Sequence, residues 1–191
     1  MPETVAGLPG PRPFGGRAHR LPRLVDRATF FGQLRRAVIR NDGIRAGLAL
    51  LSITPDPLDP GAAGGAWEIR QEVCLLTAGR LVGCLHYSYP ASRVASDEFL
   101  VLAEGVGTVA GAVDLAEQIL LAVRRPEMMR SGEDSVTASV GIAMQEPRSS
   151  AEQLQNNAAA AMYLARTGGG DRYQVYGEWM GEADVAPTRA G

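Results

Sequence analysis

Apolar residues recur at helical spacing in four stretches of the chain, and each stretch carries a recognisable start or stop signal. Asp26 and Thr108 precede two of them and can cap the first backbone N–H groups. Ser149 and Glu152 form a capping-box pattern before the last stretch, and the run Gly168–Gly170 follows it. The pattern predicts helices over residues 27–43, 67–83, 109–125 and 150–167.

Shorter apolar runs lie between these helices and predict strands. Residues 46–53 form a continuous apolar run that ends at Thr54-Pro55-Asp56-Pro57, as in a buried strand. Residues 84–105 contain two extended segments around a turn at Ala95–Asp97, which predicts a β-hairpin. Further strands are expected at 135–144, with Val136, Ala138, Val140 and Ile142 on one face, and at 172–176. This order predicts an α/β (α+β) fold with a mixed central sheet, helices on its faces and an inserted hairpin.

Composition narrows the choices of function. The formal net charge is −2, which provides no electrostatic footprint for nucleic acid or an anionic membrane surface. No apolar run approaches the roughly 20 residues that a membrane-spanning helix needs, and the N-terminus has no secretory pattern. We therefore expect a cytoplasmic protein with a flexible Pro/Gly/Arg-rich arm at 1–22, one domain at 23–178 and a flexible tail at 179–191. Neither cysteine lies at a metal-ligand spacing.

One segment carries a strong resemblance. The run S-R-V-A-S-D-E-F-L-V-L at 92–102 resembles the R-x-G-G-D-E-F signature hairpin of the GGDEF (diguanylate cyclase) family. Four further segments resemble family motifs in the same order and spacing: LVDRATFF (24–31), LALLSITPD (48–56), SVTASVGIA (135–143) and AAAAMYLARTGGGDRY (158–173). The resemblance implies a palm-like fold, similar to that of class III nucleotide cyclases. It also implies a reaction in which dimers condense two GTP molecules to cyclic di-GMP with Mg²⁺ or Mn²⁺.

The acidic residues that the family uses for catalysis are only partly present. Asp97 and Glu98 match the acidic signature positions, so the resemblance implies that they are the catalytic carboxylates and metal ligands. Asp56 matches the second acid of the family's Asp-x-Asp and is a further candidate metal ligand. Thr54 replaces the leading Asp, and a neutral hydroxyl is a much poorer ligand for Mg²⁺ than a carboxylate. Pro55 and Pro57 are expected to redirect the backbone around Asp56.

The nucleotide-binding positions also depart from the family pattern. Ala95 and Ser96 replace the two signature glycines, and a Cβ there obstructs both positive φ and close approach of phosphate. Gln71 and Arg166 are the side chains left to contact guanine and phosphate. Five other positions lack the group that the family resemblance implies. Asp59 stands in place of a lysine, Ala62 in place of the guanine-binding Asn and Gly170 in place of an arginine. His86 and Tyr89 stand in place of the Arg-x-x-Asp pair that binds the product. We expect no feedback binding of cyclic di-GMP at the last pair.

Three hypotheses follow from these residues. The first is a degenerate GGDEF domain without cyclase activity that serves as a signalling or interaction module, as a homodimer or with a protein partner, and binds GTP only if the site persists. The second is an active diguanylate cyclase that holds its metal with Asp56, Asp97 and Glu98. The third is a domain of the same fold that binds another ligand or catalyses another reaction, with the cluster His86, Tyr87 and Tyr89 as its candidate site. Side chains at alternating positions are also typical of one face of a β-hairpin, which is the simpler explanation of this cluster.

Overall fold

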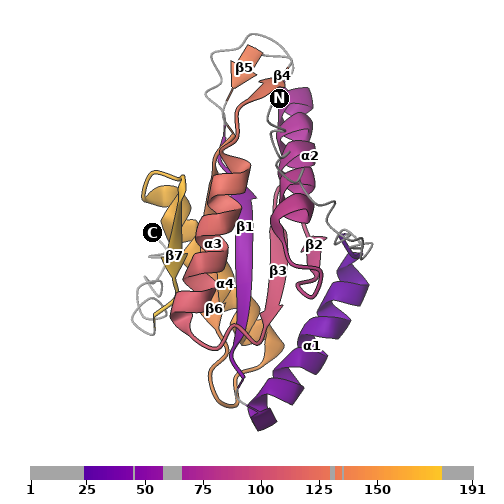
Figure 1. Ribbon diagram of the computed structural model, residues 1–191, viewed down its shortest axis with the longest axis vertical. Helices are drawn as coiled ribbons and strands as arrows, with labels where there is room; N and C mark the ends of the chain where they lie inside the picture. Colours follow the sequence, from indigo (N-terminus) through magenta and orange to yellow (C-terminus); the bar gives the residue numbers. More distant parts are fainter. Residues whose placement is uncertain (1–23, 45, 58–65, 130–131, 135, 178–191) are drawn as a thin grey trace, which may run out of the picture.

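The computed structural model describes residues 24–44, 46–57, 66–129, 132–134 and 136–177 (Figure 1). Five strands form one sheet in the order β2-β3-β1-β6-β7, in which only β6 and β7 are parallel. The strands of this sheet are β1 (Leu48–Pro55), β2 (Ala91–Arg93), β3 (Phe99–Glu104), β6 (Ala138–Met144) and β7 (Arg172–Val175). The helices are α1 (Arg27–Ile44), α2 (Ala66–Cys84), α3 (Val109–Val123) and α4 (Ala151–Thr167). The predicted mixed sheet, its flanking helices and its inserted hairpin are confirmed.

The sheet is covered on both faces, which gives the domain three layers (Figure 1). Alternate residues of the central strand β1 point to opposite faces because a strand has a period of two. Ala49, Leu51 and Ile53 join a core with α2 and α3, whereas Leu48 and Leu50 join a second core with α1 and α4. All five side chains are buried. The four residues predicted to share one face of the 135–144 strand all lie in the first core: Val136, Ala138, Val140 and Ile142. The strand itself, β6, begins at Ala138, so Val136 precedes it.

The helix starts follow the predicted capping chemistry with one correction. The backbone N–H of Thr29 donates to the Asp26 carboxylate at 2.9 Å, and that of Gly111 donates to Thr108 Oγ1 at 3.3 Å. The capping box of α4 consists of Ser150 and Gln153, one residue beyond the expected pair. Ser149 is instead held by the preceding turn, where its Oγ donates to the Glu146 carbonyl at 2.8 Å. Adjacent serines offer the same chemistry, and the turn decides which one caps the helix.

Strand β1 continues further than its sequence predicts. Thr54 and Pro55 remain in the strand and pair with Ser139 and Ala138 of β6, so Pro55 does not redirect the chain as expected. A proline is tolerated there because the pairing of β1 with β3 ends at Ile53, so no β3 carbonyl requires a donor from Pro55. Asp56 is therefore carried in line with the end of the strand.

Two short strands were not anticipated. β4 (Glu127–Met129) and β5 (Gly132–Asp134) pair with each other as a separate hairpin beyond one end of the main sheet (Figure 1). Each has three residues, too few to show an alternating pattern in the sequence. No helix in the described part of the chain is long and apolar enough to cross a membrane. The predicted arm at 1–22 and tail at 179–191 lie outside the described residues.

Helix α4 lies directly on β6 at a glycine. A Cβ on Gly141 would lie 2.1 Å from both the Ala158 carbonyl oxygen and the Met162 backbone nitrogen. Because both obstructing atoms belong to the α4 backbone, they cannot yield as a flexible side chain would. This contact therefore sets the separation of α4 from the sheet.

We expect Gly141→Ala to lower the free energy of unfolding by about 3 kcal/mol, since it forces α4 away from β6. Urea denaturation followed by circular dichroism measures this change. The matched control is Gly79→Ala in α2, where an added Cβ meets nothing within 4 Å. Its stability should be unchanged or higher by about 0.5 to 1 kcal/mol through helix propensity. Equal effects of the two substitutions would contradict the close packing of α4.

Candidate active site

The signature hairpin closes between Arg93 and Phe99, the last paired residues of β2 and β3. The Glu98 carbonyl accepts from the backbone N–H of Val94 at 2.9 Å and of Ala95 at 3.4 Å. Among the described non-glycine residues only Arg148 and Asp171 have positive φ, so Ala95 and Ser96 turn the chain without it. The loss of both signature glycines is thus compatible with a closed turn.

The tip of this hairpin is held by its own groups. The Ser96 carbonyl accepts two hydrogen bonds from the Arg93 guanidinium, through Nε at 3.1 Å and through Nη2. The buried Cys74 thiol of α2 donates to the same oxygen at 3.4 Å. Burial raises the pKa of the Cys74 thiol, which keeps it in the protonated form that can donate. The turn is therefore fastened to α2 and to β2.

The two signature acids have different surroundings. Asp97 is exposed at the tip, where its Oδ1 accepts from Ser96 Oγ at 3.1 Å. Glu98 is half-buried, and its Oε1 accepts from Ser52 Oγ at 3.0 Å. Ser52 is a fully buried β1 residue two positions before Thr54, so both face the same side of the sheet. The hairpin and the end of β1 therefore meet on the α1/α4 side.

Asp56 is occupied by the neighbouring strands. Its carboxylate accepts from Ser139 Oγ at 2.6 Å, from Thr137 Oγ1 at 2.8 Å and from the Asp171 backbone N–H at 2.8 Å. Its own backbone N–H donates to the Thr137 carbonyl at 2.9 Å. These bonds join the end of β1 to β6 and to the turn before β7. The side chain thus has a structural role in which its oxygens already have donors.

Gly170 allows this arrangement. It has a φ of +70°, and a Cβ on it would lie 2.8 Å from the Asp56 carboxyl carbon. Any other residue would meet both a strained backbone and the carboxylate. The following residue, Asp171, binds Arg124 at the end of α3 through a 2.6 Å ion pair. The family resemblance places a phosphate-binding arginine at position 170. In this chain the Asp56 carboxylate lies so close to that position that only a glycine fits there.

These residues do not fit the divalent metal that the family resemblance implies. Thr54 is neutral and 2% exposed, and the Asp56 oxygens face three hydrogen-bond donors. A hard cation needs several oxygen ligands with free lone pairs and negative charge. Among the residues that the structure describes, no three His, Cys, Asp or Glu side chains gather as a metal-binding group. Asp56, Asp97 and Glu98 are accordingly not brought together as one ligand set.

The remaining candidate residues are dispersed. Gln71 is half-buried on α2, and Arg166 is exposed in the last turn of α4; neither side chain has a recorded hydrogen-bond partner within the described segments. Asp59 and Ala62 lie outside the described residues. His86 is exposed, with Nδ1 2.7 Å from Ser88 Oγ.

Sequence reasoning missed the residues that hold these groups in place. Arg93 is the first letter of the signature and could have been found from that resemblance. Ser52, Thr137 and Ser139 are ordinary strand residues whose partners lie 46 to 83 positions away in the chain. No local pattern distinguishes such hydroxyls from other polar positions of a strand.

Comparisons with known proteins agree with this fold and hairpin. The profile of the family described as "Diguanylate cyclase, GGDEF domain" matches residues 72–172. Diguanylate cyclase TpbB of Pseudomonas aeruginosa is 31% identical over 153 residues, which are 76% of this chain and 34% of that protein. The GGDEF domain structure of the same Pseudomonas protein aligns with a TM-score of 0.69 at 27% identity, over 83% of this chain and 93% of that one.

The GGDEF domain of DgcB from Caulobacter crescentus, in a structure that contains c-di-GMP, aligns with a TM-score of 0.72 at 20% identity. That alignment covers 88% of this chain and 98% of the other, and at this identity it supports the fold alone. The chain belongs to the GGDEF family. It spans about a third of the length of the curated relatives that it matches.

We expect Asp56→Asn to lower the free energy of unfolding by about 1 to 3 kcal/mol, because an amide cannot accept all three bonds that the carboxylate accepts. Urea denaturation in the presence of EDTA measures this loss without any metal. Asp97→Asn, at the exposed tip, is the control and should change stability by less than about 0.5 kcal/mol. An unchanged stability of Asp56→Asn would show that the carboxylate is free for another role.

Proposed function

We propose that this chain is a degenerate GGDEF domain that lacks diguanylate cyclase activity and acts as a signalling or interaction module. The observation that carries the proposal is the Asp56 carboxylate, whose oxygens accept from Ser139, Thr137 and Asp171. Phosphodiester formation depends on positioning and on neutralising phosphate charge with metal ions. The Asp56 oxygens are directed to protein donors, so they have fewer lone pairs with which to hold such a metal ion.

The hairpin supports the same proposal. Ala95 and Ser96 add two Cβ atoms where the family resemblance implies backbone approach to phosphate. The Ser96 carbonyl is directed to Arg93 and Cys74, which stabilises the turn as a folded element. Each of these contacts serves packing of the hairpin, so the segment can persist without a nucleotide.

A cyclase assay tests the proposal against the active-enzyme alternative. Purified protein is incubated with GTP and Mg²⁺ or Mn²⁺, and cyclic di-GMP is measured by chromatography beside a catalytically competent GGDEF domain. We expect the protein and its Glu98→Ala variant to give the same background signal. Product that disappears in Glu98→Ala would establish the alternative, with Asp56, Asp97 and Glu98 as the metal-binding set.

Nucleotide binding is tested separately from turnover. Isothermal titration of GTP with Mg²⁺ is expected to show no saturable binding up to about 1 mM, which corresponds to less than roughly 4 kcal/mol of binding free energy. If GTP binds and the heat is lost in Arg166→Gln, the phosphate site persists although catalysis does not. In that case the module would bind GTP as a signal.

The interaction role has two forms, a homodimer and a complex with another protein. Sedimentation velocity over a hundredfold range of protein concentration distinguishes them. A dimer that forms as the protein concentration rises would support the homodimer. A protein that stays monomeric at every concentration would favour the complex with another protein.

A further inference from the structure

Helices α2 and α3 lie side by side on one face of the sheet and run in opposite directions (Figure 1). Two hydrogen bonds join them: Arg80 Nη1 donates to the Val123 carbonyl at 2.6 Å, and Gln118 Nε2 donates to the Cys84 carbonyl at 2.7 Å. A hollow of about 700 Å³ lies between the two helices, and most of the residues that line it are exposed. The outer surface of this helix pair is therefore a fixed feature that faces solvent.

An exposed leucine stands beside this hollow. Leu121 of α3 is 65% exposed, although Leu115, Ile119 and Leu120 of the same helix are buried. Leu121 also lines a second hollow, of about 340 Å³, between α3 and β7. It is thus the apolar crest of a ridge with a depression on each side. Helices pack against each other by fitting such ridges into grooves.

The hollow on the α2 side has room for a side chain of this kind. Gly79 and Gly83 lie about one turn apart on α2, and a Cβ on either would meet nothing within 4 Å. Leu75, about one turn before Gly79, is 68% exposed and adds apolar surface at one end. The same face therefore contains both an apolar projection and a space that can receive one.

Unpaired charges of opposite sign lie on either side of Leu121. Glu117 precedes it by four residues, and Arg125 follows it by four, in the turn just past the helix; both line the hollow. Both side chains are exposed, and neither has an ion-pair partner among the described residues. The two positions are separated by about 12 Å of helix rise, which is too far for them to pair with each other.

A surface whose features complement one another is suited to bind its own copy. In a two-fold interface the same patch is used by both subunits, so each contact occurs twice. We propose that the α2/α3 face binds a second copy of this chain across a two-fold axis beside Leu121. The proposal rests on the interaction role proposed above, in its homodimer form.

The axis places the two α3 helices antiparallel. Glu117 of each copy then lies opposite Arg125 of the other, so two ion pairs flank the centre of the interface. The two Leu121 side chains lie at the centre and enter the hollows beside the α2 glycines. A different protein would have to supply each of these complements itself, whereas a second copy already carries all of them. The interface requires no nucleotide.

Sedimentation velocity of the protein between about 5 and 500 μM measures this association, with an expected Kd of about 1 to 100 μM for a small interface. Leu121→Arg should raise the Kd at least about tenfold, because it places two like charges at the apolar centre. Ile39→Arg is the matched control. Ile39 is 75% exposed on α1, which packs on the other face of the sheet, so its substitution should leave the Kd unchanged.

Charge reversal tests the two-fold geometry. Glu117→Arg and Arg125→Glu should each raise the Kd about five- to tenfold, because each places like charges opposite one another at both ends of the interface. An equimolar mixture of the two variants should dimerise again, within about threefold of the original Kd, because both ion pairs are restored in the mixed dimer. Recovery also shows that both variants are folded. Arg35→Glu on α1 is the control and should change nothing.

Three results would overturn the proposal: a protein that stays monomeric up to about 500 μM, equal effects of Leu121→Arg and Ile39→Arg, or a mixture that does not recover. A dimer built on another face would give the second and third results. The cyclase assay with Glu98→Ala reads a different part of the molecule, so failure of this interface is distinguished from failure of the proposed function.

Discussion

The hydrogen bonds of the Asp56 carboxylate connect three parts of the chain that are distant in sequence: the end of β1, the start of β6 and the turn before β7. The turn can approach because Gly170 has no side chain, and it is secured from the other side by the ion pair of Asp171 with Arg124. At this end of the sheet the Asp56 carboxylate is therefore satisfied by donors of the protein itself.

The signature hairpin is likewise held by contacts within the protein. Its carbonyl at Ser96 is bound by Arg93 and Cys74, and Glu98 is bound by Ser52. Each group therefore contributes to the stability of the folded domain itself. These contacts act at one edge of the sheet, which β2 and β3 form.

Helix α1 fastens the signature hairpin from one side. Near the start of the helix, Arg27 donates to the Val94 carbonyl at 3.3 Å. The segment before α1 also adds to the edge of β2, where the Val25 N–H donates to the Ala91 carbonyl at 2.8 Å. Helix α1 and the segment before it therefore both fasten the β2 edge of the sheet.

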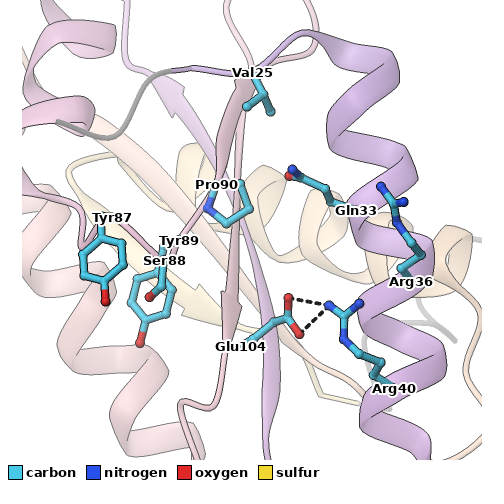
Figure 2. A pocket seen from close by; sticks show the side chains of 9 residues that line it. All are labelled: Val25, Gln33, Arg36, Arg40, Tyr87, Ser88, Tyr89, Pro90 and Glu104. Atoms are coloured by element: carbon cyan, nitrogen blue, oxygen red, sulfur yellow. Dashed lines mark hydrogen bonds and ion pairs between the residues drawn. The ribbon is translucent and has the colours of Figure 1, made fainter. Parts of the chain in front are cut away.

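The sequence by itself determined the order of most of the elements, the family and the positions that differ from the family's motifs, such as Thr54 and Ser96. Those features are local: helical periodicity, strand alternation and short motifs are complete within a few residues. Only the tertiary structure decided the role of Asp56, because its side-chain partners lie 81, 83 and 115 positions further along the chain. The same holds for the pocket that Gln33 and Arg36 of α1 line together with Tyr87 and Tyr89, about fifty positions later (Figure 2). Side-chain chemistry could be read along the chain, but whether a carboxylate binds a metal or a neighbouring hydroxyl depends on which strands the fold brings beside it.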